Sequence, residues 1–211
     1  MKVFGIDEAG RGAVIGPLVV AGVLAEEAEI RAVEPRDSKE ISPEKREEMY
    51  ERILEAAEDW TVVKIPASEI DRLRLRKNLN LIEAEVMANM VRAVSASSFF
   101  LDSPQANTQR FAELIERLSG KKVVADTFAE KKYPVVAAAS VIAKVERDRE
   151  IRKIEEEVGE ELGTGYPHDQ RTVEFLRKCA KGGGYPDFVR KSWVTASEIL
   201  ESVKQRSITD F

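Results

Sequence analysis

Acidic side chains follow three short apolar stretches that are typical of buried strands. Asp7 and Glu8 follow the first stretch, Asp102 follows the second and Asp126 follows the third. In an open α/β sheet, ligands bind at the carboxyl ends of the strands. One acid there fits an ordinary solvated turn, but several that converge on one sheet edge repel each other unless a cation neutralises them. The pattern therefore predicts a cation site.

The donor atoms indicate which cation would bind. The chain has one cysteine and one histidine, and we interpret His168 as a surface loop residue, so carboxylate oxygens are the available ligands. Such oxygen ligands suit Mg²⁺ or Mn²⁺ rather than zinc. Two of these ions, about 3.5–4 Å apart, can stabilise the attacking and leaving oxygens of an in-line phosphoryl displacement. That chemistry needs no histidine.

A glycine-flanked arginine follows the first pair of acids. Gly10 and Gly12 carry no side chain, so a backbone or a ligand can approach closely, and Arg11 offers donors to an anion. Short matches of this kind are common, and an ordinary turn is the alternative interpretation.

Strand-like and helix-like stretches alternate along the chain. Strands are predicted at residues 3–6, 14–24, 60–65, 99–101 and 121–126. Helices are predicted from Pro43, after the N-cap residue Ser42, and at residues 79–94, 108–118, 135–158, 172–180 and from 194. The alternation is typical of an α/β sheet, and the C-terminal helices are expected to form a smaller lobe.

Composition describes a folded chain with a charged surface. The sequence has 211 residues, of which 43% are hydrophobic and 34% charged, which fits one domain or one domain with a small appendage. Its single cysteine, Cys179, cannot form an internal disulfide, and no basic-then-apolar leader opens the sequence. The longest apolar run, residues 13–25, is too short to cross a bilayer. We therefore expect a cytoplasmic protein without a membrane role.

Charge is unevenly distributed along the sequence. The net charge of −5 argues against a non-specific nucleic-acid coat. Residues 26–60 carry 6 basic and 13 acidic side chains, whereas residues 170–206 carry 8 basic and 4 acidic ones. The C-terminal part could steer a polyanion, and a solvated mosaic of charges is an equally good interpretation.

Taken together, the motifs resemble type 2 ribonuclease H, or ribonuclease HII, most closely its archaeal form. The resemblance rests on residues 7–21, the triplet Asp37-Ser38-Lys39, the triplet Leu101-Asp102-Ser103, residues 136–148 and residues 163–167. These segments follow the family's order between residue 1 and about residue 195, and their combination is far more specific than any one of them.

The resemblance implies a fold and a reaction. The fold would be a ribonuclease H-like mixed sheet flanked by helices. The reaction would be endonucleolytic hydrolysis of the RNA strand of RNA/DNA hybrids and of ribonucleotides embedded in duplex DNA, with Mg²⁺ or Mn²⁺, giving 5′-phosphate and 3′-hydroxyl ends. It also implies a hydrolase of DNA replication and repair, which we expect to be a monomer.

The resemblance also assigns residues. Asp7, Glu8 and Asp102 match three of the family's four metal-binding catalytic carboxylates. The loop of Gly10, Arg11 and Gly12 matches the one that contacts the 2′-hydroxyl, which distinguishes RNA from DNA. Tyr166 matches a tyrosine that packs on the sugar at an RNA–DNA junction. The residues on motifs near the phosphate backbone are Lys39, Asn80, Ser140, Lys144 and Arg190, the last within a segment, 190–193, that resembles a backbone-binding one.

The fourth carboxylate departs from the family pattern. Counting back from Ser140, the family's aspartate falls on Glu130, whose extra methylene could shift one metal by about a bond length. Asp126 occupies a position where relatives often carry glutamate. We predict Glu130 as the ligand with Asp126 in reserve, and at least one of the two is a surface acid. Asp148 is interpreted as a structural helix charge.

The C-terminal residues give a separate indication. Gln205, Ile208 and Phe211 have the spacing of a peptide that docks on DNA sliding clamps through apolar anchors on one helical turn. A frayed terminus is the alternative. The predicted domains are a catalytic domain at 1–160, a helical substrate-binding lobe at 161–204 and a clamp-binding tail at 205–211.

Two other functions compete with the nuclease. One is a clamp-tethered hybrid-binding module in which Glu130 misplaces a metal and impairs cleavage. Metal-dependent cutting of a hybrid separates it from the nuclease. The other is a junction resolvase of the same fold, which would cut branched all-DNA substrates and need no 2′-hydroxyl, whereas the Gly10–Gly12 loop and Tyr166 favour RNA.

Overall fold

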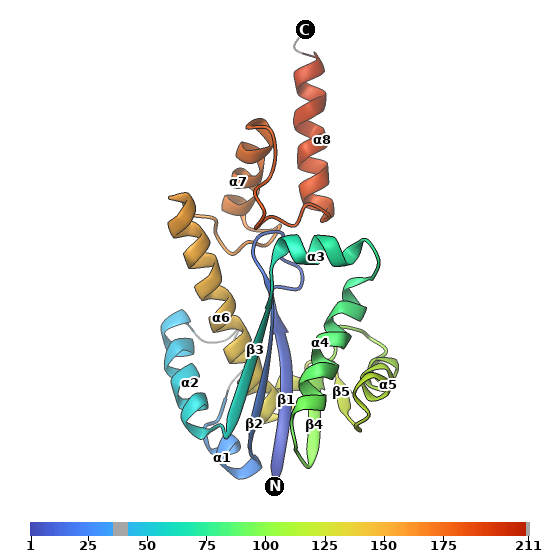
Figure 1. The fold of residues 1–211 in the computed structure, drawn as a ribbon. Coiled ribbons are helices and arrows are strands. Elements are labelled where there is room, and N and C mark those ends of the chain that lie inside the picture. Colours follow the sequence, from blue (N-terminus) through green and yellow to red (C-terminus); the bar gives the residue numbers. More distant parts are fainter. Residues whose placement is uncertain (36–41, 210–211) are drawn as a thin grey trace. The chain divides into compact units, whose positions relative to one another are not determined.

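A five-stranded mixed sheet organises the computed structural model, which describes residues 1–35 and 42–209 (Figure 1). The strands are β1 (Lys2–Ala9), β2 (Leu18–Glu26), β3 (Asp59–Ile65), β4 (Ser98–Asp102) and β5 (Val124–Asp126), in the order β3-β2-β1-β4-β5. β1 is antiparallel to β2 and parallel to β4, and β4 is parallel to β5. The predicted mixed sheet flanked by helices is confirmed.

Helices account for most of the rest. They are α1 (Glu27–Ala32), α2 (Pro43–Ala56), α3 (Ala67–Arg74), α4 (Leu79–Ala93), α5 (Thr108–Ser119), the 3₁₀ turn η1 (Ala129–Lys131), α6 (Pro134–Val158), α7 (Gln170–Lys181) and α8 (Val194–Thr209). Ser42 caps α2 as expected, since its hydroxyl accepts a hydrogen bond from the Lys45 amide. The predicted helices are confirmed, while α1, α3 and η1 were not predicted.

Contacts divide the chain into two units that are not consecutive in sequence. Unit 1 consists of Met1–Ala9, Val19–Lys64 and Asn78–Glu146, and unit 2 of Gly10–Leu18, Ile65–Lys77 and Arg147–Phe211. The chain therefore passes between units several times, once within α6. The predicted boundaries after residues 160 and 204 do not coincide with this division, because two N-terminal segments pack with the C-terminal part.

Unit 1 has a hydrophobic core on one face of the sheet. Side chains of β1 and β2 pack there against α1, α2 and the first half of α6. Figure 1 shows where these helices lie beside the sheet. Contact between α6 and β1 is unusually close: a Cβ on Gly5 would lie 2.5 Å from the carbonyl carbon of Val135. Only glycine fits at this position without a backbone shift. Residues 135–143 of α6 are all buried, so the predicted burial of its first half is confirmed.

The other face of the sheet in unit 1 is covered by α4 and α5 (Figure 1). Phe4 of β1 meets Phe99 of β4 edge to face, with ring centroids 6.1 Å apart. A Cβ on Gly22 would collide with the Phe4 ring and approach Met90 of α4. The Lys121 ammonium donates to three backbone oxygens at the C-terminal end of α4, those of Val91 at 2.9 Å, Arg92 at 3.1 Å and the C-cap residue Val94.

Unit 2 has its own apolar core. Val14 and Ile15 are fully buried there with α7 residues such as Leu176. The predicted strand at 14–24 begins only at Leu18, because Gly16 has φ +84° and Ile15 makes an isolated bridge to Val189 instead.

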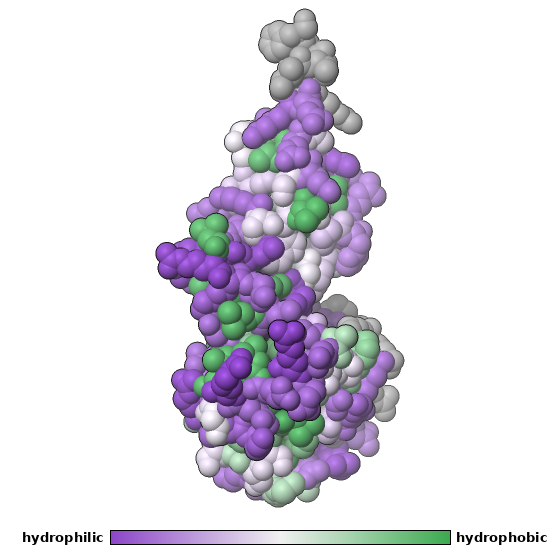
Figure 2. Space-filling model, turned by 90° about the vertical axis from the view of Figure 1, so that its right-hand side faces the viewer, coloured by the Kyte–Doolittle hydropathy of each residue, from purple (hydrophilic) through white to green (hydrophobic). Residues whose placement is uncertain are grey.

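Hydrophobic residues form separate patches among hydrophilic ones on the face drawn in Figure 2. Among the helices within residues 1–35 and 42–209, none is both long and apolar enough to span a membrane.

Candidate metal centre and sugar-binding loop

Three acidic side chains from two strands meet in unit 1. β1 and β4 are parallel neighbours, with Ile6 opposite Leu101, so the residues that follow lie at the same end of the sheet. Oxygen atoms of Asp7, Glu8 and Asp102 all lie within 4.8 Å of one another. The strand β1 continues through both of its acids to Ala9, instead of ending before them as the sequence suggested.

Asp7 is buried, with 6% of its surface exposed. Its Oδ1 accepts a hydrogen bond from the backbone N–H of Glu8 at 2.7 Å, and its carboxyl is hydrogen-bonded to Ser140. Lys144, one turn along α6, donates to the Ser140 hydroxyl at 2.8 Å. Burial raises the pKa of Asp7 to about 6, and the hydrogen bond from Ser140 and the charge of Lys144 oppose this increase.

Asp102 lies in a similar environment. Its Oδ1 accepts a hydrogen bond from the Ala129 N–H, the first residue of η1, at 2.7 Å. Burial, followed by the negative charge of Asp7, raises the pKa of Asp102 to about 7. The two neighbouring carboxyl groups repel each other when both are ionised. A divalent cation bound to their oxygens would neutralise this repulsion. The donor set therefore fits Mg²⁺ or Mn²⁺.

Glu130 and Asp126 have different surroundings. The carboxyl of Glu130 is hydrogen-bonded to that of Asp102, and its charge contributes to the raised pKa of both Asp102 and Asp7. Asp126 instead lies 2.9 Å from the Lys132 ammonium and accepts a hydrogen bond from the Tyr133 hydroxyl at 3.0 Å, which lowers its pKa. Glu130 is therefore the one of the two that contacts the acidic cluster, although it is not among the three residues whose oxygen atoms all lie within 4.8 Å of one another. Its role as the fourth ligand stays a prediction.

The other predicted phosphate contacts of unit 1 are placed differently. Ser140 and Lys144 lie beside Asp7, as described above. Asn80 lies on another element, in the first turn of α4, where it is half-buried. Lys39 lies outside the described residues.

In unit 2, the glycine loop (Gly10–Gly12) and the tyrosine turn (Gly163–Pro167) come together. The backbone N–H of Gly10 donates to the Tyr166 hydroxyl at 3.1 Å, and a Cβ on Gly12 would lie 3.8 Å from the Tyr166 ring. The ring of the exposed His168 stacks on that of Tyr166 with a centroid distance of 5.6 Å. The two motifs that the resemblance assigns to sugar contacts are therefore direct neighbours.

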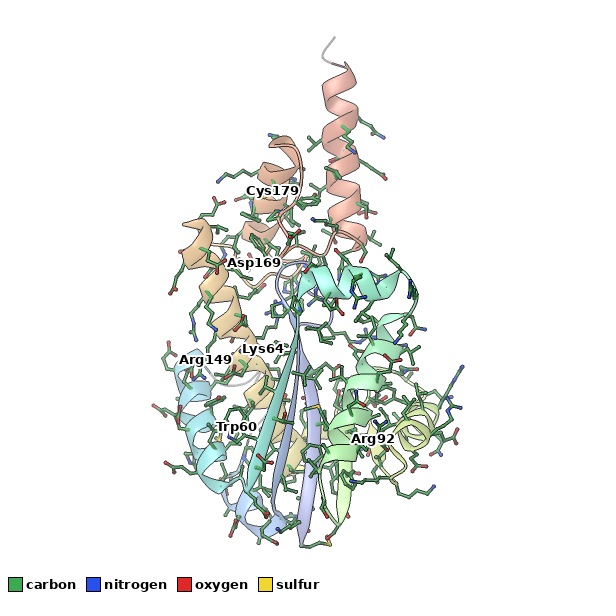
Figure 3. The ribbon with its side chains drawn as sticks, in the orientation of Figure 1. Trp60, Lys64, Arg92, Arg149, Asp169 and Cys179 are labelled. Carbon is green, nitrogen blue, oxygen red and sulfur yellow. The ribbon has the colours of Figure 1, made fainter. Side chains whose placement is uncertain are left out.

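Residues outside the predicted set fix the shape of the tyrosine turn. Asp169, labelled in Figure 3, accepts a hydrogen bond from the Thr164 N–H at 2.8 Å. Its bonds with Arg171 and Thr164 hold its pKa well below the usual value. Thr172 accepts a hydrogen bond from the Gly165 N–H at 3.1 Å. The N-cap position of Asp169 before α7 is the one local sequence signal that could have indicated this role.

Arg190 has a different environment from the one expected. It is fully buried, and its guanidinium donates to the backbone oxygens of Gly16 at 3.1 Å and Arg11 at 3.0 Å. A buried guanidinium that donates to backbone carbonyls is not presented to a phosphate. In this structure Arg190 therefore contacts the glycine loop, and its predicted role in binding the nucleic-acid backbone stays a prediction.

The segment around Arg190 is anchored to α3. The Trp193 ring contacts two guanidinium groups, with its centroid 4.7 Å from Cζ of Arg190 and 4.6 Å from Cζ of Arg74. Asp71 accepts hydrogen bonds from the backbone N–H groups of Lys191 and Ser192 at 2.7 and 3.1 Å.

The proposed clamp peptide begins within a helix. α8 continues to Thr209, so Gln205 and Ile208 lie in its last turns, whereas Phe211 lies outside the described residues. The predicted boundary at residue 205 therefore does not coincide with the end of an element.

Comparison with known proteins identifies the family. The family model for ribonuclease HII matches residues 4–196. A ribonuclease HII of Methanothrix thermoacetophila is 42% identical over 208 residues, covering 96% of this chain and 99% of that protein.

Two solved structures agree with this comparison. The ribonuclease H2 of Pyrococcus horikoshii superposes with a TM-score of 0.89 at 38% identity, covering 97% of this chain and 100% of that one. The ribonuclease HII of Archaeoglobus fulgidus, solved in complex with PCNA, has a TM-score of 0.87 at 40% identity, covering 92% and 95%. The chain thus belongs to the ribonuclease HII family of ribonuclease H hydrolases, which cleave the RNA of RNA/DNA hybrids.

Proposed function

We propose that this protein is a divalent-metal-dependent endoribonuclease that cuts ribonucleotides embedded in duplex DNA as well as the RNA strand of hybrids. The products would carry 5′-phosphate and 3′-hydroxyl ends. The observation that supports this most is the convergence of Asp7, Glu8 and Asp102 within 4.8 Å of one another in a partly buried site. Family membership supports the choice of substrate.

Four carboxylates would hold the metal: Asp7, Glu8, Asp102 and Glu130. Two Mg²⁺ or Mn²⁺ ions bound there would stabilise negative charge on the attacking and leaving oxygens of the phosphodiester. Ser140 and Lys144 favour the ionised form of Asp7, which keeps this ligand available for metal. The positive charge of the Lys144 ammonium would also attract a nearby phosphate of the substrate. We further propose that Lys39 and Asn80 contact the nucleic-acid backbone.

Sugar recognition is assigned to unit 2. The glycine loop exposes its backbone without a Cβ, which suits close approach of a 2′-hydroxyl. Tyr166 offers an aromatic face to the sugar at an RNA–DNA junction. The hydrogen bond from Gly10 to the Tyr166 hydroxyl joins the two elements, which supports a common role.

Cleavage of a uniform RNA/DNA hybrid tests the proposal. The wild type should cut only when Mg²⁺ or Mn²⁺ is added, and its products should be extended by a polymerase that requires a 3′-hydroxyl end. D7N should bind the hybrid and fail to cut it. If the wild type binds without cutting in either metal, the protein is a hybrid-binding module. Cutting of a branched all-DNA junction would instead support a resolvase.

We also propose that the C-terminal residues bind the DNA sliding clamp. Support comes from the spacing of Gln205, Ile208 and Phe211 and from the homologous enzyme of Archaeoglobus fulgidus, solved as a PCNA complex. Peptides with this spacing dock into a groove of their partner through apolar anchors. I208A/F211A should abolish binding to immobilised clamp while hybrid cleavage is retained. Unchanged binding would exclude this peptide as the contact.

A further inference from the structure

Arg147 is a buried arginine to which the sequence analysis gave no role. It lies in α6, three residues after Lys144, and belongs to unit 2. Only 4% of its surface is exposed. Burying a guanidinium costs free energy unless its charge is balanced and its N–H groups are hydrogen-bonded. The contacts of Arg147 should therefore explain why it is buried.

Those contacts involve both sugar-recognition elements. Nη2 of Arg147 donates to the backbone oxygen of Thr164, in the tyrosine turn, at 2.8 Å. The same atom lies 3.4 Å from the backbone oxygen of Ile15, which follows the glycine loop. The guanidinium also stacks on the Tyr166 ring, 4.7 Å from its centroid. One side chain thereby contacts the Tyr166 ring, the backbone of the tyrosine turn and the backbone that follows the glycine loop.

The glycine loop is shaped around this side chain. Gly10 has φ +86°, and a Cβ at this position would lie 2.5 Å from Nε of Arg147 and 2.7 Å from the backbone oxygen of Pro17. The arginine therefore occupies the space that any other residue at position 10 would need. Gly10 in turn donates to the Tyr166 hydroxyl, so the loop, the ring and Arg147 form one contact group.

Burial of the Arg147 guanidinium costs free energy. Burial lowers the pKa of Arg147, and within the described part of the chain its Nε is buried without a hydrogen-bond partner. An apolar side chain of similar length could fill this volume without that cost. It could not donate to the Thr164 backbone oxygen or present a planar cation to an aromatic face.

We propose that Arg147 is a positioning residue that holds Tyr166 and the glycine loop in the arrangement that selects a ribonucleotide joined to DNA. This inference rests on the proposed function of the two elements. The guanidinium acts through Tyr166 and the backbone, and its buried Nε is not available to substrate. Without it the ring can rotate away from the Gly10 N–H, and the substrate loses alignment more than affinity.

The test compares R147Q and R147K with R152Q, which makes the same change at an exposed position of the same helix. Two substrates are used, a DNA duplex with one ribonucleotide and a uniform RNA/DNA hybrid, and kcat and KM are measured for each. R147Q should lower kcat on the single-ribonucleotide duplex by about tenfold or more, with KM changed less than about threefold. The loss on the uniform hybrid should be smaller, and R152Q should resemble the wild type.

R147K and G10A keep the inference testable if R147Q folds poorly. Lysine retains the positive charge but cannot stack as a plane or donate in a fixed fork. R147K should therefore have a higher Tm than R147Q but the same reduced ratio of kcat on the single-ribonucleotide duplex to kcat on the uniform hybrid. G10A displaces Arg147, so this ratio should fall in G10A as well. Equal losses on both substrates, or full selectivity in R147K, would show a purely structural role. Failure of the wild type to cut the single-ribonucleotide duplex would instead overturn the proposed function itself.

Discussion

Asp7 and Asp102 retain their protons at pH values where exposed aspartates are ionised. Their ordinary pKa is 3.8, whereas burial raises that of Asp7 to about 6 and that of Asp102 to about 7. Metal binding requires the ionised forms of these carboxyl groups, so a bound cation would displace their protons and its affinity would depend on pH. The residue types and their strand-end positions predicted this cluster from sequence, because acids seldom occur in such positions without a counter-charge.

Metal-free stability should therefore depend on pH. As pH rises, the unfolded chain releases these protons near pH 4 and the folded chain only near pH 6–7. The folded state binds more protons in that window, so the stabilisation from these groups is complete below about pH 4 and lost by about pH 7. A divalent cation offsets the loss, and the increase in Tm with Mg²⁺ should grow between about pH 5 and pH 8. Thermal melts check this.

D7N is the matched control for that measurement. It removes one of the two titrating groups, so the metal-free protein should have a shallower dependence of Tm on pH than the wild type. An increase in Tm with Mg²⁺ that is the same at all these pH values would contradict the linkage.

The two candidates for the fourth carboxylate should respond differently to neutralisation. Glu130 is hydrogen-bonded to Asp102, so E130Q should weaken Mn²⁺ binding and lower kcat by about 100-fold or more. Asp126 is bound to Lys132 and Tyr133, so D126N should change kcat by less than about threefold. Titration calorimetry and steady-state cleavage measure both effects. A larger effect of D126N would reverse the assignment.

At the scale of elements, the strand and helix pattern was predictable where periodicity and caps are local. Ser42 as an N-cap and the periodic stretch from Leu79 are examples. The start of β2 was not predictable, because the apolar run from Val14 continues into it and only Gly16 and Pro17 mark the interruption. The short helix α3 was missed because its role depends on contacts with Ser192 and Trp193, far away in the sequence.

The contact between β1 and α6 gives a prediction at this scale. G5A places a Cβ 2.5 Å from the Val135 backbone, so α6 must shift. This should destabilise the fold by about 1–3 kcal/mol and lower activity, because Ser140 is carried on the displaced helix. Urea unfolding measures the first effect. G182A is the control, since a Cβ there meets backbone oxygens at 3.5 Å and beyond and its φ of −80° suits alanine. Equal stability of G5A and wild type would contradict the packing account.

At the scale of the whole molecule, the chain assembles each unit from separated segments. The proposed metal ligands all belong to unit 1, and the glycine loop, Arg147 and Tyr166 all belong to unit 2. A division at residues 160 and 204 was the natural expectation from sequence, because nothing local shows that Val14 and Ile15 pack with α7. For the same reason the sequence did not reveal Arg147, whose partners lie 17 and 132 residues away.

Cleavage of a DNA duplex that contains one ribonucleotide, in Mg²⁺ or Mn²⁺ beside an all-DNA duplex, tests the central claim most directly. The account predicts a single cut on the 5′ side of the ribonucleotide and no cut in the all-DNA control, because both the carboxylate cluster and the sugar-binding loop must act. E130D should also cut, since it keeps the charge. Cutting of the all-DNA duplex would contradict the sugar specificity. Cutting by E130D but not by the wild type would show that Glu130 disables the site.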